Sequence, residues 1–402
     1  MVNLPQAADH KTPERIGIVL DGFVALSGAR DFIVSLVDAA DRARADREIV
    51  LIFRTSRILP LGPHLNRLFG TRARDAKAKA LLKPLHDAGL LNQDIIICDR
   101  TNHDLERICA EYKIDVVGPL NKVPRKPLRV PWFGYLYDFQ HKYLTHLFTD
   151  KKRNARDTHF YSMLNKAGAV VVNAAEVKCD AEKFFPNYST KVVPLSFSAA
   201  PRENWFQTDT TVMRAKYGVG KRYFIVSNQF WLHKNHETVI QAFCELSQSY
   251  KDIELVLTGD TRDQRSPTRL KDIKSLIAEL EISDKVHILG LIPKLEQVAL
   301  LRSAIAVVQA TSFEGGPGGG SVFDGISLGV PTIVSDIPVN REIAHLVDWY
   351  FALNDIDDLS KKMIEALLCP QRTVSSDLLM QKGLERRVSM GHDVWHAAQQ
   401  SL

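Results

Sequence analysis

The stretch TSFEGGPGGGSVFDGISLGVPTIVSD, residues 311–336, determines how the rest of the chain is interpreted. The apolar run before it, residues 305–310, has the composition of a buried parallel strand. Five glycines and one proline fill positions 315–320, and residues 321–328 predict a helix that ends at Gly329. Another apolar strand follows the helix. This succession of strand, glycine loop, helix and strand is typical of a parallel α/β domain.

The glycine loop has the properties of a phosphate-binding site. Glycine has no Cβ atom, so the backbone can approach a ligand closely. The N–H groups of the loop and of the helix start can point together at an anion, and the helix dipole adds about half a positive charge. Glu314 and Asp324 flank the loop, and since carboxylates repel phosphate we expect them to face hydroxyl groups. A nucleotide sugar is a ligand that carries both phosphate and hydroxyl groups. The alternative interpretation is that the loop is a flexible turn without a ligand.

Single residues exclude three other motifs with a glycine loop. A GxxxxGK[ST] phosphate loop requires a lysine after Gly320, where the chain has Ser321. A nucleophile elbow centred on Ser321 requires a glycine at the position of Phe323. A dinucleotide fingerprint starting at Gly316 fails at Ser321.

Length and composition indicate an ordinary globular protein. The 402 residues are enough for two or three domains. The five cysteines are scattered without a CxxC pair, which indicates reduced thiols rather than disulfides or zinc ligands. The N-terminus lacks the apolar core of a signal peptide, and no apolar run approaches the roughly 18 residues of a membrane span. We therefore expect a cytoplasmic protein.

The positive charge is concentrated in the first half of the chain. The net charge is +5, and residues 51–83 hold eight basic residues with Asp75 as the one acid. Such a run is usually a solvated helix face; the alternative is attraction to an anionic substrate or membrane, worth about 1 kcal/mol per basic side chain. We therefore expect, as one partner, the inner face of the cytoplasmic membrane. Nucleic acid is not expected, because aromatic residues do not alternate with the charges.

Strand and helix patterns alternate through both halves, which predicts two parallel α/β domains with ligands in the cleft between them. We expect an N-terminal domain over 1–200, a linker in 198–208, a C-terminal domain over 201–380, and a last helix within 375–400 whose residues 381–402 pack back on the first domain. The expected strands are 16–20, 49–53, 94–98, 114–117, 133–137, 169–172, 192–195, 223–226, 254–258, 286–289, 305–309 and 331–334. The other expected helices are 31–40, 71–83, 104–112, 151–166, 236–248, 267–281, 294–303, 321–328 and 356–368.

The stretch 311–336 resembles the signature of family 4 glycosyltransferases, which consists of E-G, a glycine loop, a second acid, then G-x-P and a strand. Glu314 matches the first acid, and Asp324 matches the second because it lies five residues before Gly329. Two departures are that the loop is two residues longer than usual and that the second acid is Asp instead of Glu. The resemblance implies a GT-B fold of two doubly wound Rossmann-like domains, and retaining transfer of a hexose from a nucleoside-diphosphate sugar.

The same resemblance implies roles for particular residues. Lys234 matches a lysine that neutralises the diphosphate, and Gln229 stands where the family has an arginine. His141 matches a histidine that hydrogen-bonds the transferred sugar, and Asp138 would orient it or bind acceptor. The alternatives without a functional role are that Lys234 is a surface lysine and that His141 is a structural histidine. The implied catalytic residues are Glu314 and His141, the donor-binding residues are Gln229, Lys234, Gly315, Gly316, Gly318, Gly319, Gly320, Ser321, Asp324, Leu291 and Ile292, and the acceptor-binding residues are Asp138 and Gly28.

The family's chemistry implies neither a cofactor nor a metal. The departing phosphate oxygen takes the acceptor's proton, so the protein's task is to stabilise charge on the leaving group. The pair Asp355-Ile356-Asp357 has the spacing of a metal-binding Asp-x-Asp motif. It stands where the helix 356–368 begins, and acids at that position usually cap the helix.

A second resemblance, with less specific motifs, implies the class of acceptor. Residues 138–141, with Arg156, Asp157 and Asn173, resemble a subset of the family from bacterial surface-polysaccharide pathways. This implies a glycan or lipid-linked acceptor, with mannose suggested by pathway analogy alone. Two alternatives remain open. One is a sugar-nucleotide epimerase of the same fold, and the other is a non-catalytic nucleotide-sugar binder.

Overall fold

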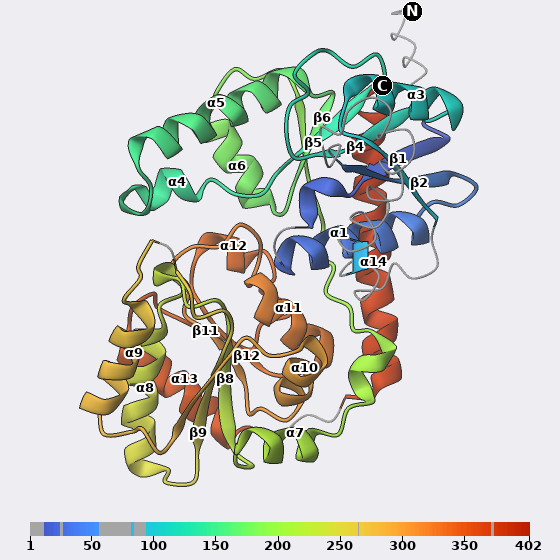
Figure 1. Ribbon diagram of the computed structural model, residues 1–402. Coiled ribbons are helices and arrows are strands. Elements are labelled where there is room, and N and C mark those ends of the chain that lie inside the picture. The colour runs from blue at the N-terminus through green and yellow to red at the C-terminus, as the bar shows by residue number, and fades with distance from the viewer. Residues whose placement is uncertain (1–11, 25–26, 56–81, 84–93, 264, 371–373) are drawn as a thin grey trace, which may run out of the picture.

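The structure of the protein is a computed structural model that describes residues 12–24, 27–55, 82–83, 94–263, 265–370 and 374–402. Most of the basic run 51–83 and almost all of the helix predicted over 71–83 lie outside these residues. The described part forms two α/β units, each built on a parallel sheet, and a long C-terminal helix runs beside both of them (Figure 1). This is the architecture of a GT-B fold, as predicted.

The N-terminal unit is a seven-stranded parallel sheet with helices on both faces. Its strands are β1 (Arg15–Val19), β2 (Glu48–Thr55), β3 (Ile95–Asp99), β4 (Val116–Leu120), β5 (Trp132–Leu136), β6 (Ala169–Val172) and β7 (Lys191–Pro194). Its helices are η1 (Asp21–Phe23), α1 (Ser27–Arg42), α3 (Asn102–Glu111), α4 (Gln140–Tyr143), η2 (Thr145–Leu147), α5 (Asp150–Lys166) and α6 (Ala175–Phe184). The strand order is β3-β2-β1-β4-β5-β6-β7, so the order reverses between β1 and β4. Open α/β sheets bind ligands at the carboxyl ends of the strands near such a reversal.

The C-terminal unit repeats this plan with six parallel strands in the order β10-β9-β8-β11-β12-β13. The strands are β8 (Tyr223–Ser227), β9 (Glu254–Thr258), β10 (Val286–Gly290), β11 (Val307–Gln309), β12 (Thr332–Ser335) and β13 (Trp349–Phe351). The helices are η3 (Glu203–Phe206), α7 (Thr210–Tyr217), η4 (Leu232–Lys234), α8 (His236–Ser249), α9 (Arg269–Glu279), α10 (Lys294–Arg302), α11 (Gly319–Leu328), α12 (Pro338–Arg341) and α13 (Ile356–Leu368). The sheet is buried between α8, α9 and α13 on one face and η3, α7 and α10 on the other.

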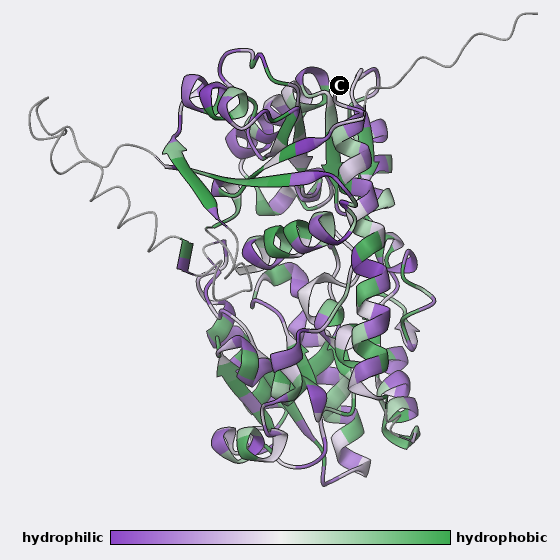
Figure 2. Cartoon of the chain, turned by 90° about the vertical axis from the view of Figure 1, so that its right-hand side faces the viewer, coloured by the Kyte–Doolittle hydropathy of each residue, from purple (hydrophilic) through white to green (hydrophobic). Residues whose placement is uncertain are grey.

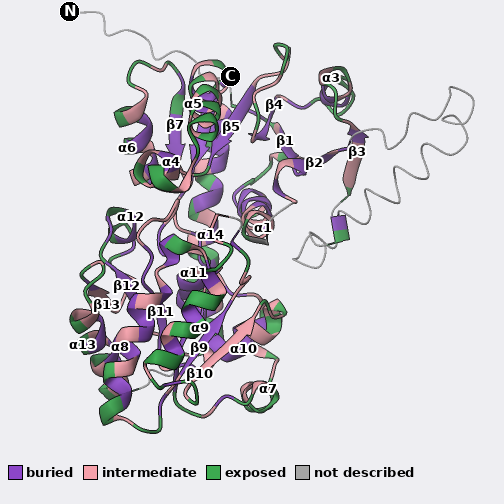
Figure 3. Cartoon of the chain, turned by 60° about the vertical axis from the view of Figure 1, so that its left-hand side comes forward, coloured by how far each residue is buried: buried purple, intermediate pink, exposed green. Residues whose placement is uncertain are grey.

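Apolar residues are concentrated on the strands and on the inward sides of the helices, and the same segments are the buried ones (Figures 2 and 3). Strands that are covered on both faces are apolar along their whole length, which explains why continuous runs such as 169–172 could be recognised in the sequence. Within the described residues, no helix has the length and apolarity that crossing a membrane would require.

The last helix, α14 (Ser376–Gln399), joins the two units. Leu379 near its start packs beside Gly329 at the end of α11, whereas its second half lies along α1. There the Trp395 indole N–H donates to the carbonyl of Ala40 at 2.9 Å. Gly391 is needed at the crossing, because a Cβ atom at this position would stand 2.0 Å from the carbonyl oxygen of Ala39.

Some elements differ from the predictions or were not predicted. β4 ends at Leu120, three residues beyond the predicted strand, and α11 begins at Gly319, two residues before the predicted helix. β13 was not predicted, because its three residues are too few to show the pattern of apolar residues that identifies a strand. α7 was missed although a signal was present, because Asp209 accepts hydrogen bonds from two amides of its first turn.

Helix α6 carries no such local signal. Its N-cap residue, Ala174, has no side chain that could accept a hydrogen bond. Instead, Glu342, just beyond α12 in the other unit, accepts from the amides of Ala175 and Glu176 at 3.0 and 2.7 Å. A carboxylate at a helix N-terminus is favourable both as a cap and with the helix dipole. The cap comes from a residue more than 160 positions away, so the start of α6 could not be predicted locally.

Candidate functional site

The glycine loop makes the start of α11. Gly318 is the N-cap residue with φ of +65°, and Gly319 follows with φ of +58°. Both values lie in the left-handed region, which glycine adopts without strain. The amides of Gly320 and Ser321 belong to the first helical turn, which has no internal acceptors, and no other acceptor is found for them among the described residues. Two N–H groups are thus available to an anion.

A buried amide network holds the loop in this shape. The Gln309 side chain, fully buried at the end of β11, donates from Nε2 to the Glu314 carboxylate at 3.0 Å and to the carbonyl of Gly318 at 2.6 Å. The Asn340 side chain accepts from the amide of Gly318 at 2.8 Å and donates to the carbonyl of Ser335 at 2.9 Å. Both ends of the loop are therefore tied to the sheet beneath it.

Lys234 lies directly beside the loop. It ends η4, the short helix after β8, and its Nζ forms an ion pair with Glu314. The exposed fractions of the two side chains are 7% and 10%. The carboxylate also meets the loop itself, because a Cβ atom on Gly319 would stand 2.8 Å from Glu314 Oε1. The predicted cation, the predicted acid and the glycine loop are therefore brought together.

The N-terminal unit faces the loop at the end of β5. A Cβ atom on Gly315 would lie 2.6 Å from the carbonyl oxygen of Tyr137 and 2.8 Å from Cβ of Asp138. One on Gly316 would lie 3.2 Å from Cβ of Asn173. The loop is therefore seated between the two units, and glycine is required where the two backbones approach most closely.

Asp138 is held in place by its own unit. Its Oδ1 accepts from Nη2 of Arg156 at 2.6 Å and from the amide of Gln140 at 2.9 Å. The Gln140 side chain in turn reaches the C-terminal unit, where its Nε2 donates to Nε2 of His233 at 3.1 Å. Burial, followed by the nearby charge of Lys234, lowers the pKa of His233 to about 2. The ring is therefore neutral near pH 7 and can accept this bond.

His141 is fully buried in α4, with its Nε2 2.9 Å from Oδ1 of Asp157. Burial lowers the pKa of His141, and the hydrogen bond to Asp157 opposes this shift. Its ring lies among the rings of Phe139, Phe148 and Phe160. Asp157 rather than Asp138 is thus the residue that orients His141, and Nδ1 has no partner within the described residues.

The second acid of the signature, Asp324, lies on the first turns of α11 and is buried. Its Oδ2 accepts from Nζ of Lys294 at 2.6 Å. Burial raises the pKa of Asp324, and Lys294 opposes the shift. Leu291 and Ile292 lie between β10 and α10, and the Leu291 side chain is 71% exposed. An exposed apolar side chain at this position is able to contact a flat base.

Gln229 and Gly28 make fewer contacts. Gln229 is half-buried after β8 and directly follows Asn228 in the chain. A Cβ atom on Gly259 would stand 2.0 Å from the carbonyl oxygen of Asn228 and 3.0 Å from the amide nitrogen of Gln229. Gly28 is exposed in the first turn of α1, and a Cβ atom there would meet nothing within 4 Å. Arg265, also in the C-terminal unit, places a positive charge opposite Gln140. Its Nη1 lies 3.4 Å from Gln140 Oε1.

The Asp-x-Asp spacing has a structural explanation. The Asp355 carboxylate caps α13 and accepts from the amide of Asp358 at 2.9 Å, so the capping interpretation is confirmed. Within the described part of the chain, no three His, Cys, Asp or Glu side chains are grouped so that they could hold a metal ion.

Several residues that support the site have little or no signal in the sequence. Gln309 had a signal, because it is a polar residue inside an apolar strand, and buried polar groups normally have specific partners. Gln140 lies in the stretch 138–141, which the sequence pattern singled out, but Asn340 and His233 had no comparable signal. Their roles depend on contacts between elements that lie far apart in the chain.

Two sequence comparisons relate this chain to glycosyltransferases. Residues 209–377 match the family "Glycosyl transferases group 1". A GDP-Man:Man(3)GlcNAc(2)-PP-Dol alpha-1,2-mannosyltransferase of Neurospora crassa is 39% identical over 63 residues, which are 15% of this chain and 11% of that protein. The chain therefore matches only a small part of that relative's length.

Solved structures share the whole architecture. The crystal structure of a glycosyltransferase from Rickettsia africae is 14% identical with a TM-score of 0.58, and the likeness covers 96% of this chain and 94% of that one. Anabaena HepE, in complex with UDP and glucose, is 12% identical with a TM-score of 0.56 over 97% and 95% of the two chains. At this identity the likeness shows the fold alone. Together with the family match, it supports a glycosyltransferase.

Proposed function

We propose that this protein is a retaining glycosyltransferase that moves a hexose from a nucleoside-diphosphate sugar to a glycan or lipid-linked acceptor. The observation that carries this proposal is the meeting of Lys234, Glu314 and the free amides of Gly320 and Ser321 against the end of β5. A cation and preorganised N–H groups suit a diphosphate leaving group, whose charge grows during transfer. The diphosphate would compete with Glu314 for Lys234 and leave the carboxylate to bind sugar hydroxyls.

The other predicted donor residues fit this arrangement as proposals. Asp324 would accept from ribose hydroxyls, and Leu291 and Ile292 would lie against the base. His141 would reach the transferred sugar only through Nδ1, since Nε2 is occupied by Asp157, and only if this buried ring became accessible. We propose that the reaction requires no metal and no cofactor. The positive charge that a metal would supply would come from Lys234 and the start of α11.

The N-terminal unit would bind the acceptor. Asp138 lies next to the glycine loop and so is placed to contact an acceptor. Gly28, at the start of α1, has no neighbouring atom within 4 Å of the position of a Cβ atom, so it would leave room for an acceptor without binding it through a side chain. We propose a role in surface-polysaccharide synthesis on the cytoplasmic side of the membrane. A peripheral contact through basic residues of the N-terminal unit would bring the enzyme to lipid-linked acceptors.

The proposal is tested by incubating the purified protein with labelled nucleotide sugars and a membrane extract as the source of acceptors. GDP-mannose and UDP-glucose are the first donors to use, because the Neurospora relative is named for GDP-mannose and the HepE structure contains UDP and glucose. We expect transfer that retains the anomeric configuration, read by NMR of the product. Lys234→Ala should lose transfer, and Lys251→Ala, at an exposed lysine, should not.

Two results would favour the alternatives. An isomerised donor in the absence of any acceptor would indicate a sugar-nucleotide epimerase. Tight binding of a nucleotide sugar without turnover would indicate a non-catalytic binder. Absence of both binding and transfer with every common donor would contradict the proposal itself.

A further inference from the structure

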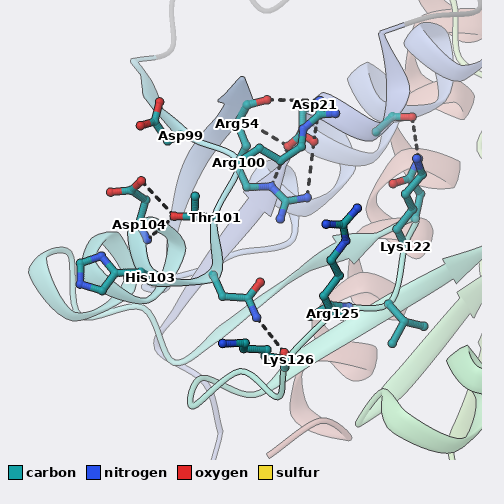
Figure 4. Close-up of a pocket in the computed structure, with 15 residues that line it drawn as sticks. Asp21, Arg54, Asp99, Arg100, Thr101, His103, Asp104, Lys122, Arg125 and Lys126 are labelled. Carbon is teal, nitrogen blue, oxygen red and sulfur yellow. Dashed lines mark hydrogen bonds and ion pairs between the residues drawn. The ribbon is translucent and has the colours of Figure 1, made fainter. Parts of the chain in front are cut away.

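A large cavity lies at the carboxyl edge of the first sheet, separate from the glycine loop. Its lining comes from the last residues of β2 and β3 and from the segments that follow β1, β3 and β4, and its volume is 1260 Å³ (Figure 4). Pockets for organic ligands have volumes of about 300–1,000 Å³, so the cavity can admit a sugar with its substituents and is larger than a bare ion needs. It lies on the same sheet edge as Asp138, which follows the neighbouring strand β5.

The walls of the cavity are fixed by hydrogen bonds between distant segments. The Asn121 side chain donates to the carbonyl of Gly22 at 2.9 Å, which ties the segment after β4 to η1. The Asn102 side chain donates to the carbonyl of Lys126 at 2.7 Å, which ties the same segment to the start of α3. These two contacts hold both sides of the cavity in place, so a ligand would meet a preformed site.

The acidic side chain at the base of the cavity is already neutralised. Asp21 is buried, and its Oδ1 lies 2.9 Å from Nε of Arg54 while its Oδ2 lies 3.3 Å from Nη2 of Arg100. Asp104, at the N-terminus of α3, accepts from the Thr101 hydroxyl at 3.0 Å, and its Oδ1 lies 3.7 Å from Nε of Arg107. The third carboxylate of the lining, Asp99, also has a partner. These three carboxylates are therefore engaged, and the further cations of the lining are additional to them.

Three more cations line the cavity, and each is exposed: Lys122, Arg125 and Lys126. None of the three has a carboxylate partner among the residues that the structure describes. The Arg125 side chain extends toward Arg100, so two guanidinium groups converge on the same space (Figure 4). Arg100 shares the one carboxylate of Asp21 with Arg54, and Arg125 has no carboxylate partner among the described residues, so positive charge is in excess here. An oxyanion between the two guanidinium groups would balance this excess and accept their N–H groups.

We propose that this cavity is an oxyanion subsite that binds a phosphate group carried by the acceptor sugar. This inference rests on the proposed function, since it assigns the acceptor's chemistry. The phosphate would lie between Arg100 and Arg125, and the sugar would occupy the remaining volume toward β5. The acceptor class is therefore a phosphorylated saccharide rather than a neutral glycan.

The test measures binding of glucose 1-phosphate and of inorganic phosphate by calorimetry at low and moderate salt. We expect the sugar phosphate to bind more tightly than free phosphate and to weaken as salt rises. Arg125→Ala should raise its dissociation constant about tenfold, as expected for loss of a charged hydrogen bond. Arg129→Ala is the matched control, because Arg129 is an exposed arginine of the same segment that does not line the cavity.

Binding to the glycine loop is separated by a second variant. Lys234→Ala should lose nucleoside-diphosphate binding and keep sugar-phosphate binding, and Arg125→Ala should show the reverse. Sugar-phosphate binding that survives Arg125→Ala, or that Arg129→Ala weakens equally, would overturn the subsite. So would binding to vesicles of anionic lipid, lost in Arg125→Ala, without any binding of the sugar phosphate. Failure of wild-type protein to bind nucleotide would instead contradict the proposed function.

Discussion

Lys234 and Glu314 stand 80 residues apart in the chain and form an ion pair in which both side chains are about nine-tenths buried. Removing two charges from water is costly, and such a pair adds stability only when the geometry and the other hydrogen bonds are good. Gln309 supplies one of these hydrogen bonds to Glu314. The pair is better explained by a need for a buried cation beside the glycine loop than by stability alone.

Lys234→Met should therefore affect stability and ligand binding separately. The single variant leaves Glu314 buried without its partner, which should cost about 3–5 kcal/mol of unfolding free energy. The double variant Lys234→Met/Glu314→Gln should recover much of that loss, because no unpaired charge remains. Neither variant should bind a nucleoside diphosphate as wild type does. Denaturant unfolding and calorimetry measure the two effects, and equal nucleotide affinity in the double variant would contradict a role for Lys234.

Because Gly319 has a left-handed backbone, Gly319→Ala should lower the stability of the protein more than Gly320→Ala does. Gly319→Ala should destabilise the protein by about 1–3 kcal/mol, because the residue has φ of +58° and its Cβ would press on the Glu314 carboxylate. Gly320→Ala should leave the melting temperature almost unchanged, since its Cβ would meet nothing within 4 Å. Thermal unfolding without added ligand compares them, and equal effects would show that the loop has another conformation.

Asp180 should make the stability depend on pH. It is buried beside the Tyr143 hydroxyl, and burial raises its pKa from 3.8 to about 6. The folded protein thus binds this proton more tightly than the unfolded chain, so the contribution is fully present below about pH 4 and is lost as pH rises through 6. Relative to wild type, Asp180→Asn should gain up to about 2–3 kcal/mol between pH 4 and pH 7. The unfolding free energies of the two proteins, measured with denaturant at several pH values, test this. A difference between them that does not change from pH 4 to pH 7 would contradict the prediction.

Gly391 should be essential for the packing of α14 on α1. Its Cβ would overlap the carbonyl oxygen of Ala39, and backbone atoms cannot move aside as a flexible side chain can. Gly391→Ala should therefore separate the helices slightly and cost about 1–3 kcal/mol. Gly28→Ala, in the first turn of α1, is the control for stability, because its Cβ has open space. A melting temperature for Gly391→Ala equal to that of wild type would refute this packing.

Metal independence is testable directly. Transfer activity should be unchanged after dialysis against a chelator, because we assign charge stabilisation to Lys234 and to the start of α11. Added Mn²⁺ or Mg²⁺ should then have no effect. Activity that disappears with the chelator and returns with Mn²⁺ would contradict the assignment.

Local sequence patterns were sufficient to predict most of the fold. Continuous apolar runs identified the buried parallel strands, because a strand covered on both faces has no polar side. The glycine loop at 315–320 was predicted as an anion site for a reason that is also local, since only glycine can supply the backbone freedom that Gly318 and Gly319 use. The cap of α13 by Asp355 was predicted in the same way.

The partners across the fold could be decided only by the tertiary structure. The pairing of Lys234 with Glu314, and the capping of α6 by Glu342, join residues 80 and more than 160 positions apart. The basic cavity combines the ends of four strands whose order in the sheet differs from their order in the chain. A sequence specifies what each side chain can do, but which charges meet depends on how the strands are ordered and how the two units are joined.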